Sequence, residues 1–472
     1  MNRKLTSSER KAIEQLLATI PKVSTCVDAI AQAGGQAFLV GGAVRDFLLK
    51  LPLKDLDFEV HGLSLEQLKK ILAKFGMVNE VGKSFGVLKF RVDNQHPDVD
   101  WSLPRFDSAG RKPKVEVDPD MTIDQALRRR DLTMNAMAIN LQTFELHDPF
   151  GGEEDLTNKL LRCPDAKLFV EDPLRFYRVM QFVGRFAMLP DAELDALCAD
   201  MDLKEVSRER VEEEMKKLML KSKEPSRAFW WLHNMGRLQA LFPEIAALAK
   251  TEQSAKHHPE GNVFKHTMQV IDAAALVRER LVDEHEKLAL MYAALCHDLG
   301  KATTTILYPD GKVTSHGHEV EGVGIAKKLL KRFCGNKDLI TTVTKLVRHH
   351  MDPGNFVVSG ARLPAYKRLA LKLAPETNCA MLALVMEADQ RGRNPDGTTP
   401  LPMPTENVEQ FLEQVKQAEV LQQPEAPVLL GRDLLDIMQP GPKLGEILKK
   451  AYEIQLNEGI KDKAELRKRV LG

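Results

Sequence analysis

The chain has 472 residues, so we expect several domains rather than one. Hydrophobic residues make up 43% of it and aromatic residues only 6%, and long stretches rich in Leu, Ala, Glu and Lys favour a mostly helical second half. Lys and Arg balance Asp and Glu to a formal net charge of zero, so a nucleic-acid partner would have to bind local basic patches.

The six cysteines are scattered along the chain without a close pair. This argues against a disulfide framework and a thiolate zinc site, and it fits a reducing, cytoplasmic environment. The polar segment from Met1 to Ser8 lacks the apolar stretch of a signal peptide. No apolar run reaches the roughly 18 residues that a membrane helix needs, so we expect no membrane partner.

The first 150 residues or so alternate between helical and strand-like patterns. A helix is predicted over residues 9–33, a short helix over 44–50, and a helix capped by Ser64 that runs to Phe75. Strands are predicted over residues 36–40, 55–60, 78–81, 86–92 and 98–103. The pattern predicts an α+β head, in which a small mixed sheet is packed with helices.

The segment Leu39–Asp46 reads LVGGAVRD, and two carboxylates follow it at Asp55 and Asp57. Side chains alternate along a strand with a period of two, so Asp55 and Asp57 point to the same face. Two carboxylates there favour a divalent metal, most simply Mg²⁺ with a phosphate-bearing substrate. Gly41 and Gly42 allow close approach of an anion, and the helix that Arg45 and Asp46 open favours negative charge at its start. This pattern predicts a two-metal nucleotidyl-transfer site.

Asp100, on the last predicted strand, is a candidate third carboxylate facing this pair. The alternative is an aspartate at a strand end beside solvent. Residues 104–121 form a long polar loop, and such loops in compact domains are usually functional or disordered.

Residues 129–136 read RRDLTMNA, which places Arg129, Arg130 and Asp131 at an apolar helix start. Charges this close to a core are seldom buried unless they are paired. The arginines could hold a ribose or a triphosphate while Asp131 orients them. The alternative is a capped, solvated helix end.

Residues 171–175 read EDPLR, and Pro173 suits the first turn of a helix. Asp172 and Arg175 are three residues apart, so they share a helix face and together offer an acceptor and several donors to the edge of a base. The alternative is a structural ion pair between the two.

These blocks together resemble the class II tRNA CCA-adding enzymes and bacterial poly(A) polymerases, in order and spacing, over about residues 30–250. The resemblance implies that Asp55 and Asp57 bind two magnesium ions. It implies that Arg129, Arg130 and Asp131 contact ribose and phosphates. It also implies that Glu171, Asp172 and Arg175 select CTP and then ATP for addition to a tRNA 3′ end. The nucleotide-binding residues predicted on this basis are Gly41, Gly42, Arg45, Asp46, Arg129, Arg130, Asp131, Asn135, Glu171, Asp172, Arg175 and Arg178.

Two departures bear on the product. Many members carry Arg where this chain has Gln181, and the loop at 104–121, which corresponds to the family's specificity segment, does not match it in sequence. The sequence therefore leaves four alternatives for the product: addition of CCA, of CC only, of A only, or of a poly(A) tail.

Nine of the thirteen histidines lie between residues 257 and 350, a density that suggests metal binding. His266, the adjacent His297 and Asp298, and the distant Asp389 resemble, in order, the HD phosphohydrolase superfamily. That resemblance implies a metal-activated water acting on phosphoesters, with a divalent transition metal or Mg²⁺, and repair of tRNA 3′ ends that carry a phosphate or cyclic phosphate. Further histidines could complete a second metal site or bind phosphate: His316, His318, His349 and His350. In an alternative interpretation of the whole chain, the main activity is that of the metal phosphohydrolase and the head serves to bind RNA.

The predicted division has four parts: a nucleotidyltransferase head (1–150), a helical neck for base recognition and RNA binding (151–255), an HD domain (256–395) and a helical tail (405–472). The tail either supports the tRNA body or caps the preceding domain.

Overall fold

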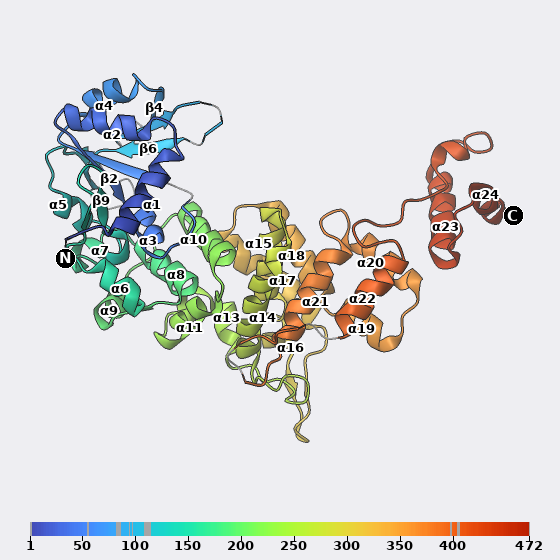
Figure 1. Cartoon of the computed structure of the whole chain (residues 1–472). Coiled ribbons are helices and arrows are strands. Elements are labelled where there is room, and N and C mark those ends of the chain that lie inside the picture. Colours follow the sequence, from blue (N-terminus) through green and yellow to red (C-terminus); the bar gives the residue numbers. More distant parts are fainter. Residues whose placement is uncertain are drawn as a thin grey trace. The chain divides into compact units, whose positions relative to one another are not determined.

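A computed structural model describes residues 2–53, 56–81, 86–93, 95–96, 98–107, 115–396, 399–403 and 406–471. The chain divides into two compact units, Met1–Val211 and Glu212–Gly472, and each is described by itself. The α+β head followed by helical parts agrees with the predicted fold class (Figure 1). No helix in the described ranges is long and apolar enough to cross a membrane.

The first unit is built around a sheet of eight strands in the order β1-β10-β9-β2-β3-β6-β5-β4. Its strands are β1 (Arg3–Lys4), β2 (Gln36–Val40), β3 (Asp57–His61), β4 (Met77–Val81), β5 (Val87–Arg91), β6 (Val99–Ser102), β9 (Ala138–Asn140) and β10 (Glu145–His147). Strands β3 and β6 are parallel, and the other neighbouring pairs are antiparallel.

Helices complete the first unit, with α2 and α4 packed together beside the sheet (Figure 1). Its helices are α1 (Ser7–Ala18), α2 (Val23–Gln32), α3 (Gly42–Leu48), α4 (Leu65–Leu72), α5 (Ile123–Arg128), the 3-10 turn η1 (Thr133–Asn135), α6 (Gly152–Asn158), α7 (Ala166–Phe169), α8 (Leu174–Phe186) and α9 (Ala192–Asp200). Helix α10 (Arg208–Lys221) begins in the first unit and continues into the second. Two short pairs lie outside the main sheet: β7 (Arg105–Asp107) with β8 (Val115–Val117), and β11 (Leu160–Leu161) with β12 (Leu189–Pro190). Phe58 on β3 stacks on Trp101 on β6 with ring centroids 4.6 Å apart, so apolar contact supports the strand pair that carries the predicted acids.

Three local predictions differ from the structure. The prediction of a single helix over residues 9–33 is wrong. The helix ends after α1 and a new one begins at α2, because Pro21 interrupts the helical pattern and Lys22 has a φ of 63°. Arg129 caps the end of α5 rather than lying at a helix start. Part of the predicted loop at 104–121 forms β7 and β8.

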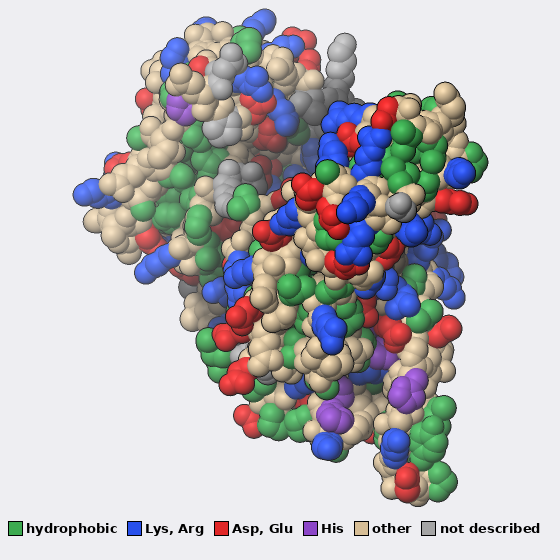
Figure 2. All heavy atoms as spheres, turned by 90° about the vertical axis from the view of Figure 1, so that its right-hand side faces the viewer, with side chains coloured by type: hydrophobic (Ala, Val, Ile, Leu, Met, Phe, Trp, Pro, Cys, Tyr) green, Lys and Arg blue, Asp and Glu red, His purple; other side chains and the backbone are tan. Residues whose placement is uncertain are grey.

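The second unit is helical, and α14, α15, α17, α18 and α21 pack against one another in it (Figure 1). Its helices are α11 (Ser226–Asn234), α12 (Leu238–Leu241), α13 (Pro243–Leu248), α14 (Val263–Val277), η2 (Arg278–Arg280), α15 (Glu284–Cys296), α16 (Lys301–Thr304), α17 (His318–Phe333), α18 (Lys337–His349), α19 (Asp352–Ser359), α20 (Leu363–Leu373), α21 (Cys379–Arg391), α22 (Glu406–Gln417), η3 (Gly431–Asp433), α23 (Pro442–Glu458) and α24 (Lys463–Leu471). A short pair, β13 (Ile306–Leu307) with β14 (Val313–Thr314), interrupts the helices. Acidic and basic side chains are interspersed on the face shown in Figure 2, in keeping with the balanced charge.

Candidate active sites

The first site lies where β3 and β6 run side by side in the head. Their parallel register sets Asp57 directly opposite Asp100, and residues in register point to the same face of a sheet. Both aspartates line a cavity of about 160 Å³, together with Glu59, Arg129 and Arg130. Asp55 lies outside the described residues. The structure thus brings Asp100 beside Asp57, and their catalytic roles remain predictions.

The donor set of this cavity fits the divalent metal that the sequence predicts. Carboxylate oxygens are the ligands that Mg²⁺ prefers, and two of them face one cavity from adjacent strands. The arginines beside them would bind phosphate oxygens of a metal-bound substrate.

Glu59 is a residue that the sequence reasoning missed. Its side chain is only 1% exposed, and it contacts Arg130 Nη2 at 3.2 Å, Arg129 Nη2 at 3.5 Å and His61 Nε2 at 3.2 Å. Burial opposes ionisation, but the hydrogen bond with His61 and the charges of both arginines outweigh it and lower the pKa of Glu59 to about 2. Glu59 therefore stays ionised and positions the arginines. The period of two after Asp57 could have revealed it, because Glu59 lies on the same strand face.

A buried hydrogen-bond chain joins residues from three of the predicted sequence blocks. Arg45 on α3 donates to Asp46 at 2.8 Å and to Asn135 at 2.7 Å, and Asn135 donates to Asp131 at 3.0 Å. Arg178 on α8 donates to the second oxygen of Asp131 at 2.6 Å. Burial opposes ionisation of Asp131, but the charge and hydrogen bond of Arg178 outweigh it and lower its pKa to about 2. The burial of Asp131 contradicts the alternative of a solvated helix end.

Gly41 meets the end of β2 where the chain turns into α3. Its φ is 67°, a value that favours glycine, and an added Cβ would lie 3.3 Å from Arg130 Nη1. A side chain here would therefore press on one of the cavity arginines. Gly42 opens α3 directly after it.

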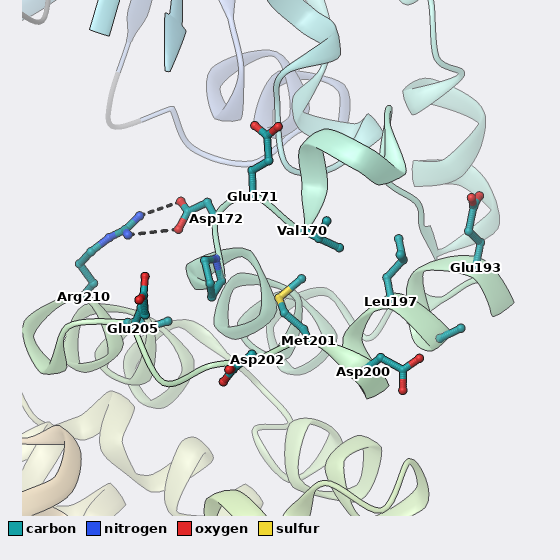
Figure 3. Close-up of a pocket in the computed structure, with 13 residues that line it drawn as sticks. Val170, Glu171, Asp172, Glu193, Leu197, Asp200, Met201, Asp202, Glu205 and Arg210 are labelled. Atoms are coloured by element: carbon teal, nitrogen blue, oxygen red, sulfur yellow. Dashed lines mark hydrogen bonds and ion pairs between the residues drawn. The ribbon is translucent and has the colours of Figure 1, made fainter. Parts of the chain in front are cut away.

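The predicted base-reading residues do not pair with each other in the structure. Asp172 accepts two hydrogen bonds from Arg210, at 3.1 and 2.7 Å (Figure 3). The Arg175 guanidinium donates to the backbone oxygens of Leu168 at 2.8 Å and Arg129 at 2.6 Å. The hydrogen bonds of Asp172 and Arg175 therefore contradict the alternative of a structural ion pair between them. An ionised carboxylate can accept about four hydrogen bonds, so Asp172 could accept from a base while Arg210 holds it.

A second cavity in the head unit, of about 720 Å³, begins beside these residues. Glu171 and Asp172 line it at one end, and residues of α9 and of the loop after it line most of the rest, both acidic (Glu193, Asp200, Asp202, Glu205) and apolar (Leu197, Met201) (Figure 3). Gln181, on α8, is buried, and its Nε2 has no hydrogen-bond partner in the described part of the chain.

The second site lies in the helical unit, where all four residues of the predicted metal set meet. His266 lies on α14, His297 and Asp298 directly follow α15, and Asp389 lies on α21. His266 Nε2 is 3.0 Å from Asp389 Oδ1, 3.7 Å from Asp298 Oδ2 and 3.3 Å from His297 Nε2. Both aspartates are held ionised: burial opposes this, but His297 and Lys301 at Asp298, and Arg393 and His266 at Asp389, keep their pKa values well below the usual range.

Two of the four additional histidines join this cluster. His318 Nε2 lies 3.3 Å and His350 Nε2 lies 3.8 Å from Asp298 Oδ1, and the two Nε2 atoms are 3.2 Å apart. His316 is exposed, and His349 instead contacts Asp352 through Nδ1. Asp298 therefore presents one carboxylate oxygen to each pair of imidazoles.

When these imidazoles are neutral, their outer contacts decide which ring nitrogen carries the proton. The Nδ1 atoms of His297, His318 and His350 lie 2.7–2.9 Å from backbone oxygens, which can only accept hydrogen bonds. A neutral imidazole that donates from Nδ1 has a lone pair on Nε2. Pairs of such lone pairs face each other within the cluster, an arrangement that a divalent cation satisfies. The donor set therefore fits the metal that the sequence predicts here.

Three family models match separate stretches of the chain. The Poly A polymerase head domain matches residues 37–162, the probable RNA and SrmB-binding site of polymerase A matches residues 196–248, and the HD domain matches residues 263–390. The first and last of these stretches contain most residues of the two sites.

Curated proteins resemble most of the chain. The multifunctional CCA protein of Actinobacillus pleuropneumoniae serotype 5b is 37% identical over 378 residues, which cover 76% of this chain and 86% of the relative. That of Burkholderia pseudomallei is 36% identical over 384 residues, which cover 77% of this chain and 87% of the relative.

Solved structures share the fold. The Thermotoga maritima CCA-adding enzyme complexed with tRNA_CCA has a TM-score of 0.61 and 19% identity, and the match covers 100% of this chain and 98% of that one. The Bacillus stearothermophilus CCA-adding enzyme in complex with CTP has a TM-score of 0.63 and 20% identity over 95% of this chain and 96% of that one.

Replacing Glu59 tests its role as the counter-charge of the arginines. Because its folded pKa lies below the unfolded value, Glu59 contributes stability above the unfolded pKa, and this contribution is lost as the pH falls from about 4.5 towards 2. We expect Glu59→Gln to lower the free energy of unfolding at pH 7 by roughly 3 kcal/mol, since one pKa unit corresponds to about 1.4 kcal/mol.

Urea denaturation between pH 7 and pH 3 measures this difference, which should be constant above about pH 5 and narrow below it. Glu66→Gln, at an exposed position on α4, is the matched control and should match the wild type. A Glu59→Gln variant as stable as wild type at pH 7 would contradict the assignment.

Proposed function

The chain belongs to the family of multifunctional CCA proteins, and we propose on this basis that it adds CCA to the 3′ ends of tRNA from CTP and ATP. The observation that carries the proposal is the cavity in which Asp57 and Asp100 face Arg129 and Arg130. Carboxylates for a divalent metal and arginines for phosphates are what transfer from a nucleoside triphosphate needs. The chain is accordingly a nucleotidyltransferase with a second, HD-type domain.

The residues of the head have distinct proposed roles. Asp57, with Asp55 and Asp100, would hold Mg²⁺, which supplies activation of the terminal hydroxyl and stabilisation of the leaving pyrophosphate. Arg129 and Arg130 neutralise the triphosphate, and Glu59 holds both of them in place. Arg45, Asp46, Asp131, Asn135 and Arg178 form the buried support that joins α3, η1 and α8 around the nucleotide site.

Base selection is assigned to Asp172 and Arg175, with Glu171 beside them. Arg175 is anchored by two backbone oxygens, so its guanidinium has a fixed direction. Asp172 accepts from Arg210 at both oxygens, so Arg210 orients the carboxylate toward the base. The choice between addition of CCA, CC, A or poly(A) depends on this region and on Gln181. Incubating the protein with tRNA that lacks its 3′ end and with each nucleotide, then sequencing the products, decides among the four.

The HD domain is proposed to hydrolyse phosphates or cyclic phosphates at RNA 3′ ends. His266, His297, Asp298 and Asp389 would hold one divalent transition metal or Mg²⁺, which supplies an activated water. Asp298, His318 and His350 would hold a second. Lys301, whose Nζ is 2.7 Å from Asp298, adds positive charge to the cavity that a phosphate would enter.

The four-part domain division, the role of the tail in binding the tRNA body, and a cytoplasmic location stay predictions. The division into two compact units falls at Val211, inside α10, and does not test the four predicted parts.

Removing the proposed metal-binding carboxylate tests the head site. We expect Asp57→Ala to reduce nucleotide incorporation about a thousandfold or more, because metal binding supplies several kcal/mol of transition-state stabilisation. Incorporation of labelled CTP and ATP into tRNA without its 3′ end measures the effect. Asp28→Ala, at an exposed position on α2, is the control, and normal incorporation by Asp57→Ala would refute the site.

Replacing Asp172 tests base selection. Loss of one base-directed hydrogen bond should reduce the discrimination between CTP and ATP by about tenfold, with a smaller effect on the affinity for triphosphate. Competition between the two nucleotides at each added position measures it. Arg210→Ala should change selection in the same direction, whereas Arg208→Ala, at a neighbouring exposed position, should not. Unchanged selection in Asp172→Ala would count against the template role.

Replacing Asp298, which both proposed metal positions share, tests the whole centre, and replacing His318, which belongs to one of them, tests the second position. We expect Asp298→Ala to lower hydrolysis of a 2′,3′-cyclic phosphate by about a hundredfold or more, with CCA addition unchanged. His318→Gln should reduce the metal content of the HD domain by one ion, measured by equilibrium dialysis in an Asp57→Ala background. His316→Gln, two residues away and exposed, serves as control. Equal metal content in His318→Gln and wild type would exclude the second position.

A further inference from the structure

A buried carboxylate behind the HD cluster has no part in the functions described so far. Glu260 lies in the loop between α13 and α14, and its side chain is 0% exposed. Its Oε1 atom is 2.7 Å from His266 Nδ1 and 3.0 Å from His258 Nδ1. A carboxylate in such a position needs partners, and these two imidazoles are the ones it contacts most closely.

Glu260 makes His266 different from the other three central imidazoles. His297, His318 and His350 donate from Nδ1 to backbone oxygens. The nearest backbone oxygen to His266 Nδ1 is that of Gly392, at 3.3 Å, so the carboxylate is its closer acceptor. A hydrogen bond to an ionised acceptor is roughly twice as strong as one to a neutral acceptor.

This contact fixes both the proton and the direction of the ring. With Nδ1–H donated to Glu260, the lone pair of His266 lies on Nε2, which faces Asp389 at 3.0 Å and His297 at 3.3 Å. Carboxylates that accept from a metal-binding imidazole in this way orient the ring and strengthen it as a donor.

His258 contacts Glu260 from the other side, through Nδ1 at 3.0 Å. Its ring lies against that of His266 with centroids 4.7 Å apart, and it lines the cavity of about 500 Å³ that leads to the cluster. Gly261, with a φ of 117°, follows Glu260 and lets the chain turn into α14.

We propose that Glu260 is a positioning residue: it orients His266 and so makes the metal position formed by His266, His297, Asp298 and Asp389 tighter than the position formed by Asp298, His318 and His350. The inference rests on the proposed metal-dependent function of the HD domain. It adds an order of filling, in which the position backed by Glu260 takes its ion first.

Titration of the full chain with Ni²⁺ tests the proposal, because Ni²⁺ prefers imidazole ligands over the carboxylates of the head. Isothermal calorimetry of the wild type should show two classes of site. In Glu260→Gln the tighter dissociation constant should rise by about 10- to 100-fold while the weaker one stays within about threefold. Glu284→Gln, at an exposed position on α15, is the matched control.

Three further measurements make the result unambiguous. His258→Gln leaves the contact between Glu260 and His266 and should keep the tighter constant within about threefold. Melting of the metal-free variants, together with CCA addition, shows whether each variant is folded. If Glu260→Gln is not folded, Glu260→Asp replaces it, and its shorter side chain should also weaken the tighter site.

The outcomes distinguish failure of the metal centre from failure of the role of Glu260. A wild type that binds no Ni²⁺ at the cluster refutes the proposed metal centre itself. A wild type that binds Ni²⁺ with the same tighter constant as the folded Glu260 variant refutes only the role of Glu260. Equal weakening in the His258→Gln and Glu260→Gln variants also overturns the inference, because it would indicate a general disturbance of the loop.

Discussion

Both sites depend on the same electrostatic constraint: an ionised group that is taken out of water must be matched by opposite charge close by. In the head, Asp57 and Asp100 share one sheet face while Glu59 on that face is matched by two arginines. A carboxylate buried as deeply as Glu59 would be neutralised by protonation without these partners. Glu59 in turn holds the two arginines in place. The positive charge that stabilises the buried Glu59 carboxylate is therefore also available to bind phosphates in the cavity.

In the HD cluster, the groups that have to be matched are the inward-facing lone pairs of the imidazoles together with the carboxylates of Asp298 and Asp389. Imidazoles from different helices converge with their Nε2 atoms inward, because backbone oxygens and Glu260 hold their Nδ1 protons outward. Such a centre is arranged for a cation before the cation binds, which reduces the cost of organising ligands. The difference among the outward contacts, one carboxylate against three carbonyl oxygens, is what distinguishes the two proposed metal positions.

The buried chain from Arg45 to Arg178 has a different task, since it joins segments that lie more than 130 residues apart in sequence. A hydrogen-bonded network of charged groups is costly when one member is lost, because the remaining members are left buried and unpaired. Residues that the motif marks as nucleotide-binding therefore also hold α3, η1 and α8 together. Their replacement would affect both the fold and the chemistry of the head, which is why Glu59 and Asp172 are the better residues to test.

The sequence by itself determined which chemistry to expect at both sites, because motifs fix residue type and local spacing. The period of two predicts one strand face for Asp55 and Asp57, and the order of His266, His297, Asp298 and Asp389 predicts a metal set whose four residues the structure brings together. Only the tertiary structure decided which distant residues meet: the parallel register that sets Asp100 opposite Asp57, the approach of Arg210 to Asp172, and the selection of His318 and His350 over His316 and His349. Local patterns carry no information on register or on helix packing, and the break between α1 and α2 shows that even a regular apolar spacing fails where one proline interrupts it.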